Sequence, residues 1–199
     1  ALQLASSRPD MIFVAKLLNH GADPNIWGGK YGTALIVASS QGHVANVKEL
    51  LAKGADINAQ GGDYGTALQA ASYRGHIEVI QLLVKMGADV NAQGGTYGTA
   101  LQAASSGGHI EVIQLLVEKG ADVNAQGGFY GTALQAALSG GYIEVIQLLV
   151  EKGADVNAQG KYLSLVRIRS SSGIRRWLLW DSKWTMDLGP WIMDRRPVT

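Results

Sequence analysis

Three histidines that recur at a spacing of 33 residues are the side chains best suited to bind a metal ion. They are His43, His76 and His109. A shared zinc ion needs ring nitrogens at about 2.0–2.1 Å from the metal, whereas equivalent residues of stacked structural units lie roughly 8–10 Å apart. Tyr142 also occupies the fourth position of the series. We therefore expect no metal site, and imidazoles that hydrogen-bond to loop backbone instead.

Four aspartates with the same spacing are candidates for general acid–base chemistry, since glycosidases use paired carboxylates at separations of about 6.5–9.5 Å. They are Asp56, Asp89, Asp122 and Asp155. Each one follows Gly-Ala just after a predicted helix end, where an aspartate side chain accepts a hydrogen bond from nearby backbone. The pattern favours turn stabilisation over catalysis.

The sequence gives little support for a phosphate-binding loop or for a serine or cysteine nucleophile. Gly94 and Gly95 precede a predicted helix, but the Gly-Lys-Ser/Thr ending of a phosphate-binding loop is missing. No serine stands in Gly-x-Ser-x-Gly, and the chain contains no cysteine. We predict no catalytic residues, no cofactor and no enzymatic activity. The alternative is an active site within the repeats, which would require a bound metal or small molecule.

The elements that carry these residues repeat with the same period of 33. Gly-Ala-Asp begins at Gly21, Gly54, Gly87, Gly120 and Gly153, and Tyr-Gly-Thr-Ala-Leu begins at Tyr31, Tyr64, Tyr97 and Tyr130. The stretches 64–96 and 97–129 differ at only five positions. Thr66 is a typical helix cap, Gly75 ends that helix, and Gly87 ends the apolar helix that follows. Each unit is therefore predicted to be a helix, a turn, a second helix and a short glycine-rich finger.

One such helix pair cannot bury both sides of its apolar second helix, but stacked neighbours can. Five pairs are predicted, near residues 1–20, 34–53, 67–86, 100–119 and 133–152. The predicted fold class is therefore an all-α solenoid of stacked helix-turn-helix units joined by β-hairpin-like fingers. It forms one domain over residues 1–160 with a truncated first unit, and residues 161–199 form a separate, irregular tail.

The repeated unit resembles the ankyrin repeat. Its sequence is G-T-A-L-Q-A-A-S-x-x-G-H-I-E-V-I-Q-L-L-V-x-x-G-A-D-V-N-A, and the resemblance covers residues 1–160. Thr66–Gln69 departs from the family's usual Thr-Pro-Leu-His, and Tyr64 stands where the finger usually has glycine. The segment Gly-Gly-x-Tyr-Gly-Thr-Ala-Leu-Gln is similar to arrays common in filamentous fungi, which often end larger proteins with a nucleotide-binding signalling core.

This resemblance implies a non-catalytic module that binds a protein partner through the concave surface of its fingers and first helices. Because the chain starts at Ala1 within the pattern, we expect a fragment of a longer protein in which the array is monomeric. We also expect the isolated fragment to self-associate through its apolar ends. The alternative is a ligand-sensing or regulatory arm of a larger nucleotide-hydrolysing signalling protein. The expected location is intracellular, and cytoplasmic rather than nuclear.

Positions that differ between copies are the candidates for partner contact, because shared positions maintain the fold. The finger tips change from unit to unit, Trp27 replaces a glutamine of later copies, and an aromatic–basic pair ends one first helix. Trp, Tyr and Arg are typical anchors of protein interfaces, although neutral drift among copies is the alternative for any single residue. The predicted partner-binding residues are Trp27, Lys30, Asp63, Tyr73, Arg74, Thr96 and Phe129.

Charge differs between the array and the tail. Residues 1–160 contain 9 Lys or Arg against 13 Asp or Glu, whereas residues 161–199 contain 8 against 3. The array lacks a basic stripe, so we expect no nucleic-acid partner. No apolar run approaches the roughly 18–20 residues that span a bilayer, so we expect no membrane partner for the array.

The tail holds four of the five tryptophans. Residues 174–188 are predicted to form a loosely amphipathic helix with one aromatic stripe. The stripe consists of Trp177, Trp180, Trp184 and Leu188. Three roles stay open for the tail: a cap over the last helix pair, a basic helix at an anionic membrane surface, or a disordered segment.

Overall fold

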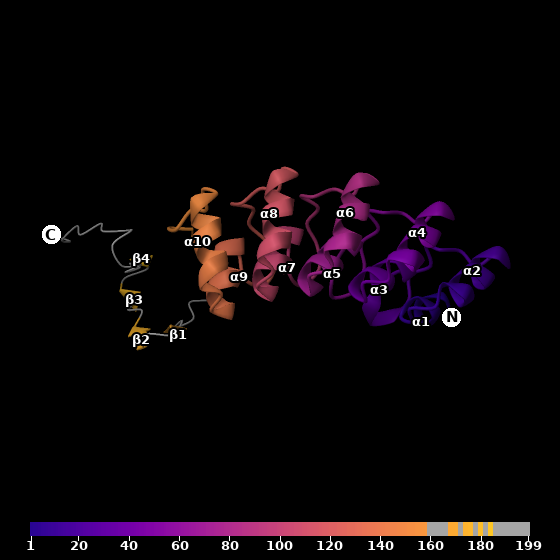
Figure 1. The fold of residues 1–199 in the computed structure, drawn as a ribbon, viewed down its shortest axis with the longest axis horizontal. Helices are drawn as coiled ribbons and strands as arrows, with labels where there is room; N and C mark the ends of the chain where they lie inside the picture. Colours follow the sequence, from indigo (N-terminus) through magenta and orange to yellow (C-terminus); the bar gives the residue numbers. More distant parts are fainter. Residues whose placement is uncertain (159–166, 171–172, 177–178, 181–182, 185–199) are drawn as a thin grey trace.

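The computed structural model describes residues 1–158, 167–170, 173–176, 179–180 and 183–184 of the 199-residue chain. Within residues 1–158 the α-helices come in five successive pairs. They are α1 (Leu2–Ser6) and α2 (Met11–Asn19), α3 (Ala34–Ser40) and α4 (Val44–Ala52), α5 (Ala67–Arg74) and α6 (Ile77–Lys85), α7 (Ala100–Gly107) and α8 (Ile110–Glu118), and α9 (Ala133–Gly140) and α10 (Ile143–Glu151). Figure 1 shows the odd-numbered helices side by side in one row and the even-numbered helices in a second row. The predicted all-α solenoid of stacked helix-turn-helix units is confirmed.

The ends of the first helix in each repeat follow from a few local side chains. In α5, Thr66 Oγ1 accepts a hydrogen bond from Gln69 N at 3.2 Å, and Gln69 Oε1 accepts one from Thr66 N at 2.7 Å. This reciprocal arrangement is a capping box, and it recurs at the start of α7 and α9. Gly75 ends α5 in a left-handed conformation with φ of +75°, which favours glycine. The predicted cap and stop residues are confirmed.

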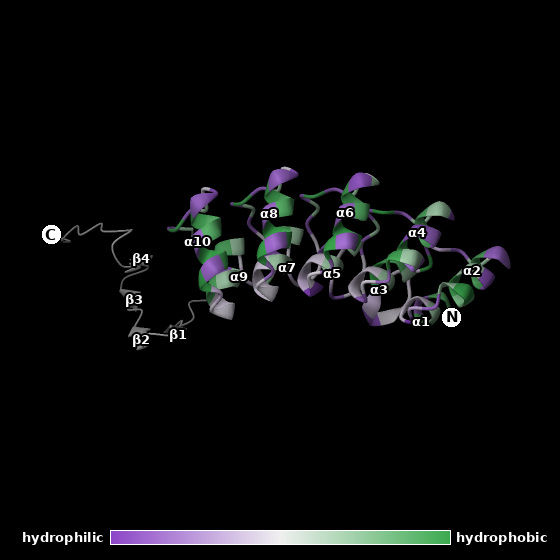
Figure 2. Ribbon diagram, in the orientation of Figure 1, coloured by the Kyte–Doolittle hydropathy of each residue, from purple (hydrophilic) through white to green (hydrophobic). Residues whose placement is uncertain are grey.

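A continuous apolar core runs through all five helix pairs, from Leu2 to Ala154. In α6, the side chains of Val79, Ile80 and Leu83 are completely buried. Figure 2 shows the corresponding hydrophobic segments along the even-numbered helices. The odd-numbered helices, which are rich in Ala and Ser, pack against one another more closely than the even-numbered helices do, because small side chains allow short distances between helix axes.

Two polar side chains in each central unit bond it to the next unit. Gln69 Nε2 donates to Ala92 O, in the loop after α6, at 2.8 Å and to Gly98 O of the following unit at 2.6 Å. Asn91 Nδ2 donates to Gly120 O at 3.0 Å, and Asn91 Oδ1 accepts from Asp122 N at 2.8 Å. The bond accepted by Oδ1 recurs at Asn25, Asn58 and Asn124, and the bond donated by Nδ2 recurs at Asn25 and Asn124. Stacking therefore rests on a repeated set of hydrogen bonds as well as on apolar burial.

Short strands replace the helix predicted over residues 174–188. They are β1 (Arg167–Ser170), β2 (Gly173–Arg176), β3 (Leu179–Trp180) and β4 (Lys183–Trp184), and they pair antiparallel as β1 with β2 and β3 with β4. The helix prediction is wrong in these described parts, because Ile and Trp favour extended backbone when a strand pair satisfies it. Trp177, Leu188 and the predicted domain boundary at residue 160 lie outside the described residues, and the three roles considered for the tail stay predictions.

Candidate functional site

The finger tips of successive units lie next to one another in a row. The fingers of the third to fifth units are each closed by an antiparallel bridge between two glycines. Asp63 N donates to the carbonyl of Lys30 at 3.2 Å, and the carbonyl of Asp63 accepts from Thr96 N at 2.8 Å. Phe129 N continues the series with a bond to Thr96 O at 2.8 Å. We call these four residues the tip row, since backbone hydrogen bonds join each member to the next.

The close approach of neighbouring fingers requires glycine. Gly95 has a φ of +60°, and a Cβ atom at this position would collide with the backbone of Tyr64 and Gly65 in the preceding finger. Gly62 and Gly128 also have positive φ angles, and a Cβ atom at either position would collide with the backbone of the preceding finger. These shared glycines therefore fix the spacing at which the variable tip side chains are presented.

The N-terminal end of the tip row combines an ion pair with an exposed indole. Lys30 Nζ lies 3.4 Å from Asp63 Oδ2, and the two side chains are 70% and 59% exposed. An ion pair this open contributes little to stability. Trp27 is 61% exposed, and its ring lies against the backbone of Gly61. The structure thus brings Trp27 to the same end of the row as the ion pair.

Tyr73 and Arg74, which end α5, belong to a cluster of three tyrosines: Tyr64, Tyr73 and Tyr97. We call these three residues the tyrosine cluster. The ring of Tyr73 stacks on that of Tyr97 with centroids 4.3 Å apart, and lies 6.1 Å from that of Tyr64. Arg74 Nη2 donates to the Tyr64 hydroxyl at 3.1 Å, and its guanidinium lies 5.6 Å from the centre of the Tyr73 ring. Hydrogen bonding and cation–π attraction together hold this cation over the cluster.

The pKa values of Arg74 and Tyr97 are both raised by their surroundings in the cluster. The hydrogen bond that Arg74 donates to the Tyr64 hydroxyl raises the pKa of Arg74 above its ordinary value. Burial raises the pKa of Tyr97 well above that of a solvated phenol, and its hydrogen bond with Tyr73 acts in the same direction. Arg74 therefore presents a permanent positive charge beside Tyr97, which keeps its phenol proton.

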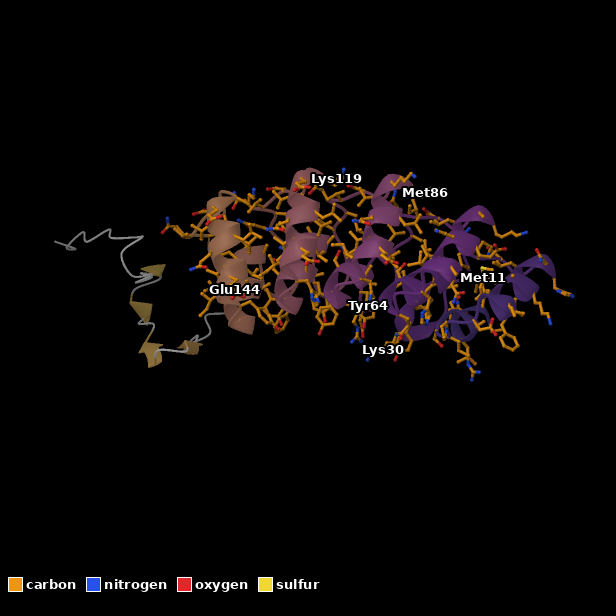
Figure 3. The ribbon with its side chains drawn as sticks, in the orientation of Figure 1. Met11, Lys30, Tyr64, Met86, Lys119 and Glu144 are labelled. Carbon is orange, nitrogen blue, oxygen red and sulfur yellow. The ribbon has the colours of Figure 1, made fainter. Side chains whose placement is uncertain are left out.

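The remaining predicted residues extend this surface toward the fifth unit. Thr96 is exposed and follows Asp63 in the tip row. Phe129 is 48% exposed and meets the ring of Tyr130 edge to face, with centroids 5.1 Å apart. In Figure 3, Lys30 and Tyr64 lie on the side of the odd-numbered helices, whereas Met86 and Lys119 lie at the far ends of even-numbered helices.

The sequence pattern does not single out Tyr64 and Tyr97, although these residues connect the tip row to the end of α5. Tyrosine stands at this position in all four fingers, so the variation between copies gives no signal. The signal available in the sequence is adjacency, because Tyr64 follows the variable residue Asp63 directly. An invariant residue beside a variable one can belong to the same surface.

The three recurring histidines, which we call the histidine column, make the backbone contacts predicted from the sequence. The Nε2 atoms of His43, His76 and His109 lie 3.3, 3.1 and 2.9 Å from a carbonyl oxygen at the end of the preceding unit's first helix. Burial lowers the pKa of His76, and the hydrogen bond to Ser40 O opposes this shift only in part. Among the described residues, no group of three His, Cys, Asp or Glu side chains is arranged to hold a metal ion.

The aspartate column makes turn contacts, as predicted. Asp89 Oδ1 accepts a hydrogen bond from Asn91 N at 2.9 Å, and the other aspartates of the column accept the same bond from the residue two positions later. A hollow of about 320 Å³ lies between the second helices beside His109, and Gly75 and Glu111 also line it. Neither feature supplies a nucleophile with an adjacent base.

Comparison with known proteins identifies the repeated unit. A family model described as ankyrin repeats, in three copies, matches residues 2–94, 61–127 and 92–160. No curated protein matches the chain. In the part of the chain that the structure describes, none of the helices has the length and apolar character needed to cross a membrane. The chain belongs to the ankyrin-repeat family, whose repeats are in general non-catalytic modules for protein–protein interaction.

Proposed function

We propose that this chain binds a protein partner through the tip row and the adjacent ends of the first helices, with no catalytic step. The observation that carries the proposal is the tip row itself, in which an invariant backbone frame presents side chains that differ in every unit. Because backbone hydrogen bonds already order the tips, little conformational entropy is lost when a partner docks. Discrimination between partners would then come from the variable side chains.

The curvature of the array supports the choice of this side. The odd-numbered helices pack more closely than the even-numbered helices, so the array bends with its first helices on the inner side. On this side Trp27 and Phe129 are exposed, and Tyr73 is half-buried. Large aromatic side chains and arginine are the residue types that most often dominate binding energy at interfaces.

The repeat supplies replacements that its own frame already accommodates. Each candidate residue can be changed to the residue found at the equivalent position of another unit, which removes the proposed contact without introducing a foreign side chain. The variant carries Trp27→Gln, Lys30→Thr, Tyr73→Ser, Arg74→Gln and Phe129→Thr. A matched control carries Lys85→Glu and Met86→Lys at the end of α6, which are the residues of the next unit at those positions.

The test is affinity capture with mass spectrometry, with the full chain, the five-residue variant and the control as baits. Circular dichroism establishes that all three baits are folded. We expect proteins that the full chain and the control retain and the variant loses. If the variant retains the same proteins, the assigned surface is wrong; if the control loses them, the partner binds the second helices instead.

A cytoplasmic location and a monomeric state in the parent protein are part of the same proposal. Fluorescence imaging of the tagged full chain tests the location. Sedimentation of the isolated chain at micromolar concentration tests its expected self-association, and a clean monomer would contradict that expectation.

A further inference from the structure

Charge divides residues 1–158 into two sides. The second helices and the loops after them carry eleven acidic and six basic side chains, whereas the first helices, the fingers and the turns within pairs carry two acidic and three basic ones. On the side of the first helices and fingers, Asp63 pairs with Lys30, and Asp10 caps α2 by accepting a hydrogen bond from Ile12 N at 2.8 Å. Both acids are therefore already engaged there, so the side that carries the tip row is the more positive one.

Arg74 is the cation best placed on this side to bind an anion. It has no acidic partner among the described residues. The guanidinium has five N–H donors in a planar fork, and the Tyr64 hydroxyl accepts from one nitrogen only. The side chain is exposed at the end of α5, and its contacts with Tyr64 and Tyr73 orient it in advance of binding. A carboxylate or phosphate matches such a fork with two hydrogen bonds.

The tyrosine cluster adds flat apolar surface and hydroxyl donors around this charge. The rings of Tyr73 and Tyr97 stack in near-parallel fashion, at an interplanar angle of 25°. Residues that flank an anionic side chain in an extended peptide can pack on these rings. The acidic side chains of the second helices repel the same segment, so they direct it toward the tip row.

We propose that the partner segment that docks on the tyrosine cluster is an acidic peptide, and that Arg74 binds its anionic side chain. This inference rests on the proposed function and specifies the partner for that surface. A basic segment would meet Arg74 with like charge, and a neutral segment would leave the guanidinium unpaired.

The test uses the full chain and four immobilised peptide libraries that are random except at a fixed central residue. This residue is glutamate, phosphoserine, glutamine or lysine. We expect the glutamate or phosphoserine library to retain roughly tenfold more protein than the glutamine library, since hydrogen bonds to charged groups are the stronger kind. The lysine library should retain the least. Raising sodium chloride from about 50 to 500 mM should reduce the preference, because salt screens exposed charges.

Two variants of the full chain assign the effect to its residue. Arg74→Gln introduces the residue that Gln41 places at the same position of the second unit, so the frame accommodates it. It should abolish the preference for anionic peptides. Lys85→Glu serves as the control for net charge, and it should leave the preference intact.

The outcomes separate this inference from the function on which it rests. Preference for phosphoserine or for glutamate supports the inference and identifies the anion as phosphate or carboxylate. Equal retention of the glutamate, phosphoserine and glutamine peptides overturns the inference, and loss of that binding in Tyr73→Ser would still support the surface. Absence of retention on every library also overturns it, whereas the capture experiment decides the proposed function independently.

Discussion

Residues 64–96 and 97–129 form two units that are nearly the same in sequence and differ in their surface chemistry. The five differences are Tyr73/Ser106, Arg74/Gly107, Lys85/Glu118, Met86/Lys119 and Thr96/Phe129. The helices, caps and inter-unit bonds are equivalent in the two units. Among the units within residues 1–158, only the third places an aromatic ring between two finger tyrosines and an arginine above that ring. The comparison teaches that the shared residues determine the fold and that a few variable residues determine the surface.

Removal of a core leucine should reduce stability most, and it tests whether the cores of the two units are equivalent. Leu83 and Leu116 are completely buried at the same position of α6 and α8. Leu83→Ala and Leu116→Ala should each destabilise the chain by about 2–5 kcal/mol, because each leaves a cavity in the core. Urea unfolding measures both. A difference between the two variants larger than about 1 kcal/mol would show that the frames are not equivalent.

Loss of the bridging glutamine should cost less than loss of a core leucine. Gln69 is completely buried, completes a capping box and donates to the carbonyls of Ala92 in its own unit and Gly98 in the next. Gln69→Ala should destabilise by about 1–3 kcal/mol, because it removes half of the cap and leaves buried carbonyls unpaired. Gln102→Ala should have the same effect by urea unfolding, and an effect of either variant below about 0.5 kcal/mol would contradict the role assigned to these bonds.

The tyrosine cluster should contribute a smaller amount, and only in the third unit. Tyr73→Ser installs the residue of the fourth unit and should cost about 0.5–1.5 kcal/mol, as typical for the loss of an aromatic pair. The reverse change, Ser106→Tyr, should place a ring between the fingers that carry Tyr97 and Tyr130. Near-ultraviolet circular dichroism should decrease for the first variant and increase for the second. An unchanged signal for Tyr73→Ser would contradict the stacked arrangement.

The smallest expected effect concerns pH. Burial lowers the pKa of His76 in the folded chain, while the unfolded chain keeps the ordinary value of about 6.5. Below that pH the unfolded state binds more protons, so stability should fall as pH decreases from about 6.5 toward the folded pKa, and then level off. His76→Tyr introduces the residue that Tyr142 places at the same position of the last unit. Urea midpoints between about pH 5 and 8 should depend less on pH in this variant.

An unchanged pH dependence in His76→Tyr would contradict the assignment to this imidazole. Arg74 lies close enough to contribute to the lowered pKa of His76. Arg74→Gln should therefore slightly weaken the pH dependence of stability that His76 causes.

The frame could be predicted from the sequence, whereas the contacts between units could not. The period of 33, the cap at Thr66 and the stop at Gly75 follow from local patterns. Gln69 stood out only as a departure from Thr-Pro-Leu-His, because its bonds to the next unit depend on how far apart two units stack. Variation between copies indicated Tyr73, but its place between two fingers required the three-dimensional arrangement.

In the described parts of the tail, by contrast, the sequence pattern predicted the wrong secondary structure. Tryptophans spaced three and four residues apart, such as Trp177, Trp180 and Trp184, match a helical stripe. The same residues are also strong strand formers, and the described parts of this stretch are paired strands. Spacing alone cannot distinguish the two structures when the segment is short.

The hydrogen bonds that the asparagine Oδ1 atoms accept from the next unit, and those between neighbouring finger tips, use the same atoms at each junction along the described array. A genetic duplication that inserts one further copy of 33 codons, the length of one unit, would reproduce both of its junctions. Such an insertion would lengthen the tip row by one position without requiring any compensating change elsewhere. Duplication can therefore lengthen the array one unit at a time. The tip residue of each new unit can then change without altering the residues that maintain the fold.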